Sequence, residues 1–172
     1  MYIRDIKEND IENIRRLIGD SYTPYKDLIK DIGIPVYTDD EIKALLDEPH
    51  SDAWVAVEDD EIVGMAAGTE FGPCAYHLKM MFVSGQTQHK GIGRALLEKF
   101  EKRGAERHYS LYTANYLGWA AWSGQFYKKH GYREYVAEDV TDNQDLKSQA
   151  DFLREIGRLN NGDKHLIWKT GS

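Results

Sequence analysis

Cysteine is almost absent from this sequence, since Cys74 is the only one among 172 residues. A single thiol cannot form an internal disulfide framework or a multi-cysteine zinc site, and no metal is expected. No run of about 18 apolar residues is present, so no membrane-spanning helix is expected. The N-terminus, MYIRDIKEND, is charged and lacks the apolar centre of a signal peptide. These absences predict a cytoplasmic protein with no membrane partner.

Positive charge is also scarce. The chain carries 22 Lys and Arg against 29 Asp and Glu, a formal net charge of −7. General nucleic-acid binding usually needs a basic surface, so no nucleic-acid partner is expected. Prolines number only four, hydrophobic residues make up 41%, and no low-complexity tract divides the chain. We therefore expect a single folded domain over residues 1–172.

The spacing of hydrophobic residues predicts alternating strands and helices. Strands are predicted at residues 2–6, 53–57, 62–69, 76–83, 109–114, 132–137 and 165–169. Helices are predicted from Asn9, from a capping box at Thr38–Glu41, at 91–103, at 119–129, and as an extra helix at about 142–158. In the predicted order of elements, helices and strands alternate only in the second half of the chain. The predicted class is therefore α/β (α+β), with a mixed, mostly antiparallel central sheet of six to seven strands flanked by helices.

The loop that follows the strand at 76–83 carries the clearest functional signal. It leads into Gly91-Ile92-Gly93 and then an amphipathic helix. Glycines allow close backbone approach, and the amides and dipole of a helix start favour an anion. Residues 88–108 hold six basic and three acidic residues, a local charge of +3. The pattern favours a phosphate or pyrophosphate group, although it is neither a P-loop nor a dinucleotide fingerprint. Alternatively, the glycines only ease a tight turn.

Two motifs together resemble the GNAT N-acetyltransferase superfamily. Gln88-x-x-Gly91-x-Gly93 is similar to its acetyl-coenzyme A pyrophosphate motif, and Phe126-Tyr127-Lys128-Lys129-His130-Gly131-Tyr132 is similar to its late-helix signature. The predicted element order matches over nearly the whole chain. The resemblance implies a V-shaped split between two central parallel strands, at 76–83 and 109–115. It also implies an acetyl-CoA-dependent N-acetyltransferase in which an amine attacks directly in a ternary complex.

The resemblance gives particular residues a role. The backbone near Met81, Phe82 and Val83 would bind the pantetheine arm. The pyrophosphate would lie against the loop and first helical turn, at Gln88, His89, Lys90, Gly91, Ile92, Gly93 and Arg94, and Phe126 would contact the cofactor. Tyr127 matches the tyrosine that faces the thiol and protonates the departing thiolate. Considered without the motif around it, Tyr127 is better explained as a core aromatic whose hydroxyl has a partner.

The general base and one cofactor contact stay open. His77 stands where some family members carry a glutamate, and histidine suits proton transfer near neutral pH, but a structural histidine fits as well. Glu70 is a second candidate for the base. The family asparagine seven residues before the tyrosine is replaced by Ala120, so Asn115 or Ser123 would have to substitute. A usual proline is replaced by Gly85, which is expected to loosen the turn.

Acidic residues and tyrosines mark the expected acceptor region. Residues 20–48 hold eight acidic residues and three lysines, together with Tyr22, Tyr25 and Tyr37, and residues 138–151 hold five acidic residues and one lysine. The pattern favours a cationic amine, either a small molecule or a basic peptide, unless the acids only cap helices. The family also implies a possible homodimer. Two other functions stay open, a CoA-binding sensor or interaction module without turnover, and a nucleotide or phosphate binder outside the family.

Overall fold

The computed structural model describes residues 1–172 except 32, 34–35, 137, 139–141, 157–163 and 172. Its strands are β1 Tyr2–Asp5, β2 Ser51–Glu58, β3 Glu61–Phe71, β4 Ala75–Val83, β5 Leu111–Leu117, β6 Arg133–Glu134 and β7 Lys164–Thr170. Its helices are α1 Ile11–Ser21, α2 Lys26–Ile29, α3 Asp39–Asp47, α4 Ile92–Glu106, α5 Ala121–Lys129 and α6 Gln144–Glu155, with short 3-10 turns η1 Glu8–Asp10 and η2 Thr23–Tyr25.

Over the described residues the strands form one seven-stranded sheet in the order β1-β2-β3-β4-β5-β7-β6. The pair β4–β5 is parallel, whereas β1–β2, β5–β7 and β6–β7 are antiparallel. The mixed, mostly antiparallel sheet flanked by helices confirms the predicted fold class. The V-shaped split between the parallel strands stays a prediction.

The chain divides into two compact units. The first consists of Met1–Gly68 and Met80–Phe100, and the second of Thr69–Lys79 and Glu101–Ser172. Strands β3 and β4 and helix α4 each contribute residues to both units. The two units are therefore described separately below.

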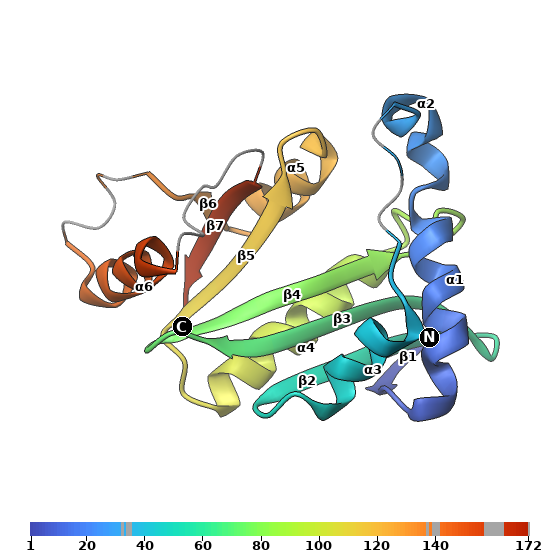
Figure 1. Ribbon diagram of the computed structural model, residues 1–172, viewed down its shortest axis with the longest axis horizontal. Helices are drawn as coiled ribbons and strands as arrows, with labels where there is room; N and C mark the ends of the chain where they lie inside the picture. Colours follow the sequence, from blue (N-terminus) through green and yellow to red (C-terminus); the bar gives the residue numbers. More distant parts are fainter. Residues whose placement is uncertain (32, 34–35, 137, 139–141, 157–163, 172) are drawn as a thin grey trace. The chain divides into compact units, whose positions relative to one another are not determined.

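In the first unit, helices α1 and α3 lie in front of the strands and α4 lies behind them (Figure 1). The apolar face of α1 enters the core with residues from β2 and β3, among them Ile14, Leu17, Val55 and Met65. On the other side, a Cβ at Gly64 would come within 2.9 Å of Ile92 and Leu96. Glycine at this position lets α4 pack close to β3.

The start of α1 differs from the prediction. Asn9 is not the cap, because the chain first makes the 3-10 turn Glu8–Asp10 and α1 begins at Ile11. The buried Asp10 carboxylate accepts the Lys7 amide at 2.7 Å and two hydrogen bonds from the Arg4 guanidinium, at 2.7 and 2.9 Å. These bonds, from residues three and six positions before Asp10, stabilise the turn in place of a cap at Asn9.

The second unit holds the parallel pair and the C-terminal strands. Residues Ala75–Leu78 of β4 pair in register with Leu111–Ala114 of β5. Along the other edge of β5, its residues Leu111–Leu117 pair with β7. The predicted strand at 132–137 is too long, since the strand itself comprises Arg133 and Glu134, and residue 137 lies outside the described residues. The Tyr135 amide continues the pairing with one bond to the Leu166 carbonyl of β7, at 2.9 Å. As the last strand in the sheet order, β6 has a partner on one side only.

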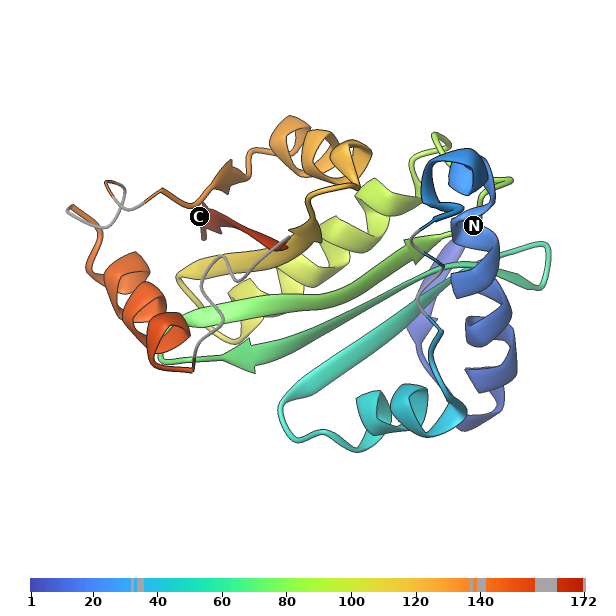
Figure 2. The ribbon, with the colours of Figure 1, turned by 45° about the horizontal axis from the view of Figure 1, so that its top comes forward.

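Helix α6 is the predicted extra helix, over Gln144–Glu155; residues 157 and 158 of the predicted range lie outside the described residues. Leu146, Ala150 and Leu153 pack into a core with residues of β4, β5 and β7. Figure 2 shows the helix beside the turn between β3 and β4. At this turn the thiol of Cys74 donates to the carbonyl of Asp145 at 3.0 Å. Burial, followed by the charge of Asp145, raises the pKa of the Cys74 thiol to about 11.

Candidate functional site

The loop between β4 and α4, residues 84–91, is called the anion loop below. Its backbone turns sharply at His89, with φ 70°, and at Gly91, with φ 86°. The first bond into α4 is from the Ala95 amide to the Gly91 carbonyl, at 3.0 Å. The amides of Ile92, Gly93 and Arg94 precede it, so the helix supplies no acceptor for them. They form a set of donors at the positive end of the helix dipole, which suits an anion.

Side chains around the anion loop add positive charge on its exposed surface. His89 and Lys90 are exposed, and a Cβ built at Gly91 would meet nothing within 4 Å. The space in front of Gly91 is therefore open to a ligand. Arg94 is exposed as well, but its guanidinium donates to Glu98 at 2.8 Å, and that bond raises its pKa.

The end of α1 holds the anion loop in place. The carboxylate of Asp20 accepts the Ser84 hydroxyl at 2.5 Å and the Gly85 amide at 3.0 Å. The side-chain amide of Gln88 donates to the Ser21 carbonyl at 3.0 Å, and its oxygen accepts the Tyr25 hydroxyl at 3.0 Å. Gln88, predicted to contact the pyrophosphate, therefore uses its side chain to brace the loop.

Gly85 has a packing role that the sequence did not indicate. A Cβ at this position would lie 2.7 Å from the carbonyl oxygen of Asp20 and 2.7 Å from Cδ of Pro24. The residue does not loosen the turn as expected. Its missing side chain lets the loop approach α1 closely enough for the hydrogen bonds to Asp20.

Aromatic side chains gather where β4 ends. The ring of Phe82 lies 6.2 Å from that of Tyr22 and 6.0 Å from that of Tyr37, centre to centre. Burial raises the pKa of Tyr22 to about 12 and also raises that of Tyr37. The structure thus brings together, near the anion loop, the tyrosines that the sequence assigned to the acceptor region.

Tyr127 lies in α5 with only 5% of its surface exposed. Its ring packs against Phe126 at 5.3 Å and Tyr132 at 5.6 Å. Burial raises the pKa of its hydroxyl well above the ordinary value. The hydroxyl is a neutral donor at physiological pH, which is the state that a proton donor requires.

His77 is buried in the parallel pair, with 9% of its surface exposed. Its Nδ1 lies 3.0 Å from the hydroxyl of Thr113, and its ring lies 4.7 Å from that of Phe71. The other proposed base, Glu70, is exposed at the end of β3. The geometry makes His77 a rigidly held group in the second unit, compatible with either proposed role.

The remaining predicted cofactor contacts lie on β5 and α5. Asn115 is exposed on β5, and Ser123 and Phe126 are half-buried on α5. Helix α5 lies close to β5, because a Cβ at Gly124 would meet the Tyr116 ring at 2.8 Å. Of the β4 residues, Phe82 packs toward the first unit's core, and Met81 and Val83 are half-buried. These assignments stay predictions.

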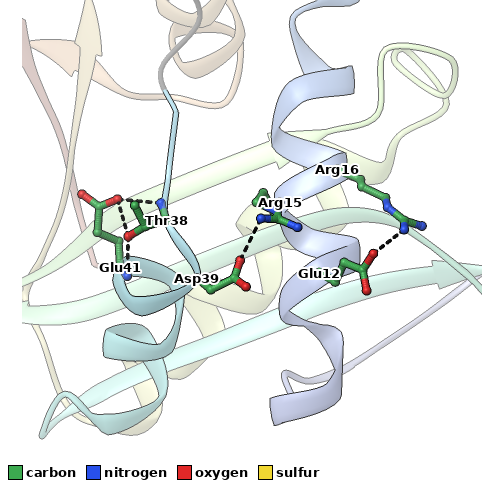
Figure 3. Close-up of polar contacts among 6 residues, drawn as sticks. All are labelled: Glu12, Arg15, Arg16, Thr38, Asp39 and Glu41. Atoms are coloured by element: carbon green, nitrogen blue, oxygen red, sulfur yellow. Dashed lines mark hydrogen bonds and ion pairs between the residues drawn. The ribbon is translucent and has the colours of Figure 1, made fainter.

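Several acids of residues 20–48 do cap helices or form ion pairs (Figure 3). The Thr38 amide donates to the Glu41 carboxylate at 2.7 Å, and the Glu41 amide donates to the Thr38 hydroxyl at 3.2 Å, which confirms the capping box. Asp39 pairs with Arg15 at 3.4 Å. The structural interpretation therefore holds for Asp39 and Glu41. Asp27 and Asp40 also lie in the first turns of α2 and α3, and Asp20 bonds to the anion loop.

Asp20 is a partner of the anion loop that the sequence alone does not indicate. The contact joins residues 64 positions apart, and no local pattern signals it. Among the residues that the structure describes, no cluster of His, Cys, Asp or Glu side chains is suited to a metal ion. None of the described helices has the length and apolar character that crossing a membrane requires.

Comparison with solved structures shows the same fold in bacterial and archaeal proteins. A GNAT-family acetyltransferase from Staphylococcus aureus Mu50 has a TM-score of 0.73 and 17% identity, over 99% of each chain. The ribosomal-protein-S18-alanine N-acetyltransferase from Escherichia coli has a TM-score of 0.70 and 11% identity, over 99% of this chain and 94% of that one. The PaiA N-acetyltransferase from Thermoplasma acidophilum, solved with coenzyme A, has a TM-score of 0.70 and 15% identity, over 98% of each chain.

None of the curated proteins matches the chain. The family model of the acetyltransferase (GNAT) domain does match, over residues 49–134, which is half of the sequence. That range includes the anion loop, the parallel strands and α5, which carries Tyr127. The chain therefore belongs to the GNAT acetyltransferase family.

Proposed function

We propose that the protein transfers an acetyl group from acetyl-CoA to a primary amine. The observation that carries the proposal is the anion loop, with its left-handed Gly91, the three first-turn amides of α4 and the exposed Lys90. These groups fit a pyrophosphate, because backbone donors and a cation converge where no side chain fills the space. We also propose that residues 1–172 act as one catalytic domain in the cytoplasm, as the sequence predicts.

The residues that would hold the cofactor lie on both sides of the anion loop in the sequence. Backbone groups of Met81, Phe82 and Val83 would pair with the pantetheine arm, in the manner of an added strand. The amides from Gln88 to Arg94 would bind the pyrophosphate. Asn115, Ser123 and Phe126 are the proposed contacts from β5 and α5. When bound, acetyl-CoA supplies the activated acetyl group as a thioester.

The proposed reaction requires two proton transfers that side chains of the protein would carry out. As the amine nitrogen bonds to the acetyl carbon, one of its protons must leave, and His77 is our proposed acceptor, with Glu70 as the second candidate. As the carbon–sulfur bond breaks, the sulfur gains a proton, which the Tyr127 hydroxyl would donate. The raised pKa of Tyr127 keeps that proton in place until it is needed.

A cationic amine is the acceptor class that we propose. Exposed Asp27, Asp31 and Asp40 lie in the same stretch as Tyr22 and Tyr37, so this region presents negative charge and aromatic rings together. Both features attract a protonated amine. The E. coli neighbour is named for acetylating an alanine of a ribosomal protein, and so a peptide amino terminus belongs among the candidates.

The deciding experiment measures release of free CoA thiol from acetyl-CoA in the presence of individual amines. The panel consists of spermidine, spermine, an aminoglycoside, lysine, and one basic and one acidic N-terminal peptide. We expect release with a cationic acceptor, and loss of that release in Tyr127→Phe. Binding of CoA without release from any amine would favour the CoA-binding sensor. Binding of ATP or NAD without binding of CoA would contradict the proposed function.

A further inference from the structure

Helix α5, which carries Tyr127, is held against β5 by another tyrosine. Tyr116 lies near the end of β5 and is half-buried. A Cβ at Gly124 of α5 would come within 2.8 Å of Cζ of the Tyr116 ring and within 3.1 Å of its hydroxyl oxygen. Because Gly124 has no side chain, the helix rests directly on this ring, beside the end of β5 (Figure 1). Both elements belong to the second unit.

The Tyr116 side chain also has partners on the two strands that follow α5. Its hydroxyl donates to the carboxylate of Glu134 on β6. Its ring stacks on the imidazole of His165, its register partner on β7, with 5.0 Å between the ring centres and 15° between the planes. The Glu134 carboxylate also lies 3.5 Å from Nδ1 of His165 and 3.5 Å from Nζ of Lys128, which directly follows Tyr127. Three strands and α5 therefore meet at Tyr116.

The hydrogen bond between Tyr116 and Glu134 contributes more to this arrangement than the ion pair does. The side chains of Lys128 and Glu134 are 54% and 38% exposed, so water screens their attraction. A hydroxyl that donates to a carboxylate makes a charge-assisted hydrogen bond, which is stronger than a bond between neutral groups. The same bond holds the pKa of Glu134 below its ordinary value, so the acceptor is charged at neutral pH.

The two contact points on α5 lie on either side of Tyr127 in the sequence. Gly124 and Lys128 are four residues apart, so they share one face of the helix. Tyr127 comes three residues after Gly124, which is just under one turn. A rotation of α5 that carried Tyr127 away would have to move Gly124 across the Tyr116 ring. The contact at Gly124 therefore restricts the direction in which Tyr127 points.

A short turn joins the end of α5 to β6. The carbonyl of Tyr127 accepts the amides of His130 and Tyr132, at 2.9 and 3.1 Å. The chain then enters β6, where Glu134 is paired with β7. Because the turn is short and bonded to Tyr127, the link between Glu134 and Tyr116 holds the end of the helix against β5.

We propose that Tyr116 and Glu134 are positioning residues, which set the rotation of α5 and thereby the direction of the Tyr127 hydroxyl in the reaction. This inference rests on the proposed function, in which Tyr127 donates a proton to the departing sulfur. A proton donor must lie at hydrogen-bond distance from the atom that it protonates, so a small rotation of the helix lowers the rate. Tyr116 acts through Tyr127, and no proton passes through Tyr116 itself.

The first test measures steady-state release of CoA by three variants. Tyr116→Phe keeps the ring on Gly124 and removes the bond to Glu134. We expect its kcat at saturating acetyl-CoA to fall by about tenfold, with KM for acetyl-CoA within about twofold of the parent value. Glu134→Ala should lower kcat by the same factor. Glu134→Gln should stay within about threefold of the parent, because its amide oxygen can still accept the Tyr116 hydroxyl.

The matched control for Tyr116→Phe is Tyr135→Phe. Tyr135 is buried in the same unit, and its hydroxyl accepts a bond from Nη2 of Arg154 at 3.4 Å. The control thus also removes one hydroxyl bonded to a charged side chain, but its partner lies on α6 rather than on α5 or β6. We expect both variants to lose a similar, small amount of melting temperature and only Tyr116→Phe to lose kcat. Equal kcat values in the two variants would overturn the assignment of Tyr116.

The second test determines whether Tyr116 acts through Tyr127. If it does, the loss caused by Tyr116→Phe disappears once the Tyr127 hydroxyl is absent. The double variant Tyr116→Phe/Tyr127→Phe should then have a kcat within about twofold of that of Tyr127→Phe. Losses that multiply in the double variant would overturn the inference and leave the proposed function intact. Failure of the parent to release CoA with any amine would contradict the proposed function, and this inference with it, so the two failures are distinguishable.

Discussion

His77 and Thr113 are direct partners in the parallel register of β4 and β5, and Nδ1 of the histidine lies 3.0 Å from the threonine hydroxyl. Thr113 is fully buried. A buried hydroxyl needs a partner, and the ring of His77 supplies it. The bond restricts the rotation of the imidazole, and the hydroxyl can donate to Nδ1 or accept a proton from it.

Thr113→Val is expected to disturb this arrangement while keeping the side chain's shape. If His77 is the base, kcat should fall by about tenfold in Thr113→Val and by about a hundredfold in His77→Ala, with KM for acetyl-CoA nearly unchanged. Steady-state kinetics measures both effects. If His77 is purely structural, these substitutions should lower the free energy of unfolding by about 1–3 kcal/mol and leave kcat of the folded protein unchanged.

Tyr127→Phe is expected to lower kcat by about a hundredfold at saturating acetyl-CoA, because the sulfur loses its proton donor. The ring packing against Phe126 and Tyr132 is retained, so the melting temperature should change little. Tyr2→Phe is the matched control, since Tyr2 is 57% exposed at the N-terminus. A kcat equal to that of the control would remove Tyr127 from the reaction.

Alkaline pH should destabilise the protein through its buried tyrosines. Burial raises the pKa of Tyr22 to about 12 and that of Tyr116 to about 12, and raises those of Tyr127 and Tyr132 as well. In the unfolded chain these groups ionise near pH 10, so the folded state binds more protons above that pH. The stability that they contribute is complete below about pH 10 and is lost as the pH rises through about 12.

A spectrophotometric titration of tyrosinate in the near ultraviolet checks this expectation. In the folded protein a group of tyrosines should ionise only at a pH above that of the others, whereas in the denatured protein all should ionise in a single step at about pH 10. Identical curves for folded and denatured protein would show that the tyrosines are not buried.

The Arg4–Asp10 pair is expected to stabilise the turn before α1. The hydrogen bond from Arg4, and then the bond from the Lys7 amide, hold the pKa of Asp10 below 3.8 despite its burial. Asp10→Ala should cost about 2–4 kcal/mol near pH 7, because it leaves Arg4 and the Lys7 amide without their partner. A carboxyl group whose pKa is lower in the folded than in the unfolded state contributes stability at pH values above its unfolded pKa. That contribution is lost as the pH falls through the folded pKa. The difference in the free energy of unfolding between the parent and Asp10→Ala, measured with denaturant, should therefore be smaller at about pH 3 than near pH 7.

Gln149 is expected to be a site of easy stabilisation. Its side chain is fully buried on α6, and neither amide atom has a hydrogen-bond partner among the described residues. Gln149→Met keeps the length and removes the unpaired polar atoms, so it should raise the free energy of unfolding by about 1 kcal/mol. Gln144→Met, an exposed position on the same helix, should change it by less than about 0.5 kcal/mol. A destabilised Gln149→Met would mean that the amide has a partner in solution.

Local patterns predicted most of the fold. The capping box at Thr38 and Glu41 forms as expected, because each partner is three residues from the other. In the turn between β2 and β3, Asp59 and Asp60 have positive φ values of 50° and 63°. These features depend on short-range hydrogen bonds and on the backbone preferences of individual residues, so they can be predicted from a single sequence.

Contacts between distant residues account for what the sequence could not predict. Asp20 and Ser84, Tyr25 and Gln88, and Gly85 beside Pro24 meet only because the fold brings α1 to the end of β4. The turn before α1 depends on nearer partners of Asp10, the Lys7 amide three residues away and the Arg4 guanidinium six residues away, which the Asn9–Glu12 pattern does not include. The motif Gln88-x-x-Gly91 located the anion loop, and only the fold assigned Gln88 its bracing role.

Because its single cysteine is poorly reactive, the protein itself reacts only slowly with thiol reagents. With a pKa of about 11 and its Sγ atom bonded to the Asp145 carbonyl, Cys74 holds only a small fraction of the reactive thiolate at neutral pH. A colorimetric thiol reagent would therefore report CoA liberated by turnover against a low and slowly rising background from the enzyme. For the same reason, a cysteine placed on an exposed surface would take up a maleimide dye selectively, without prior removal of Cys74.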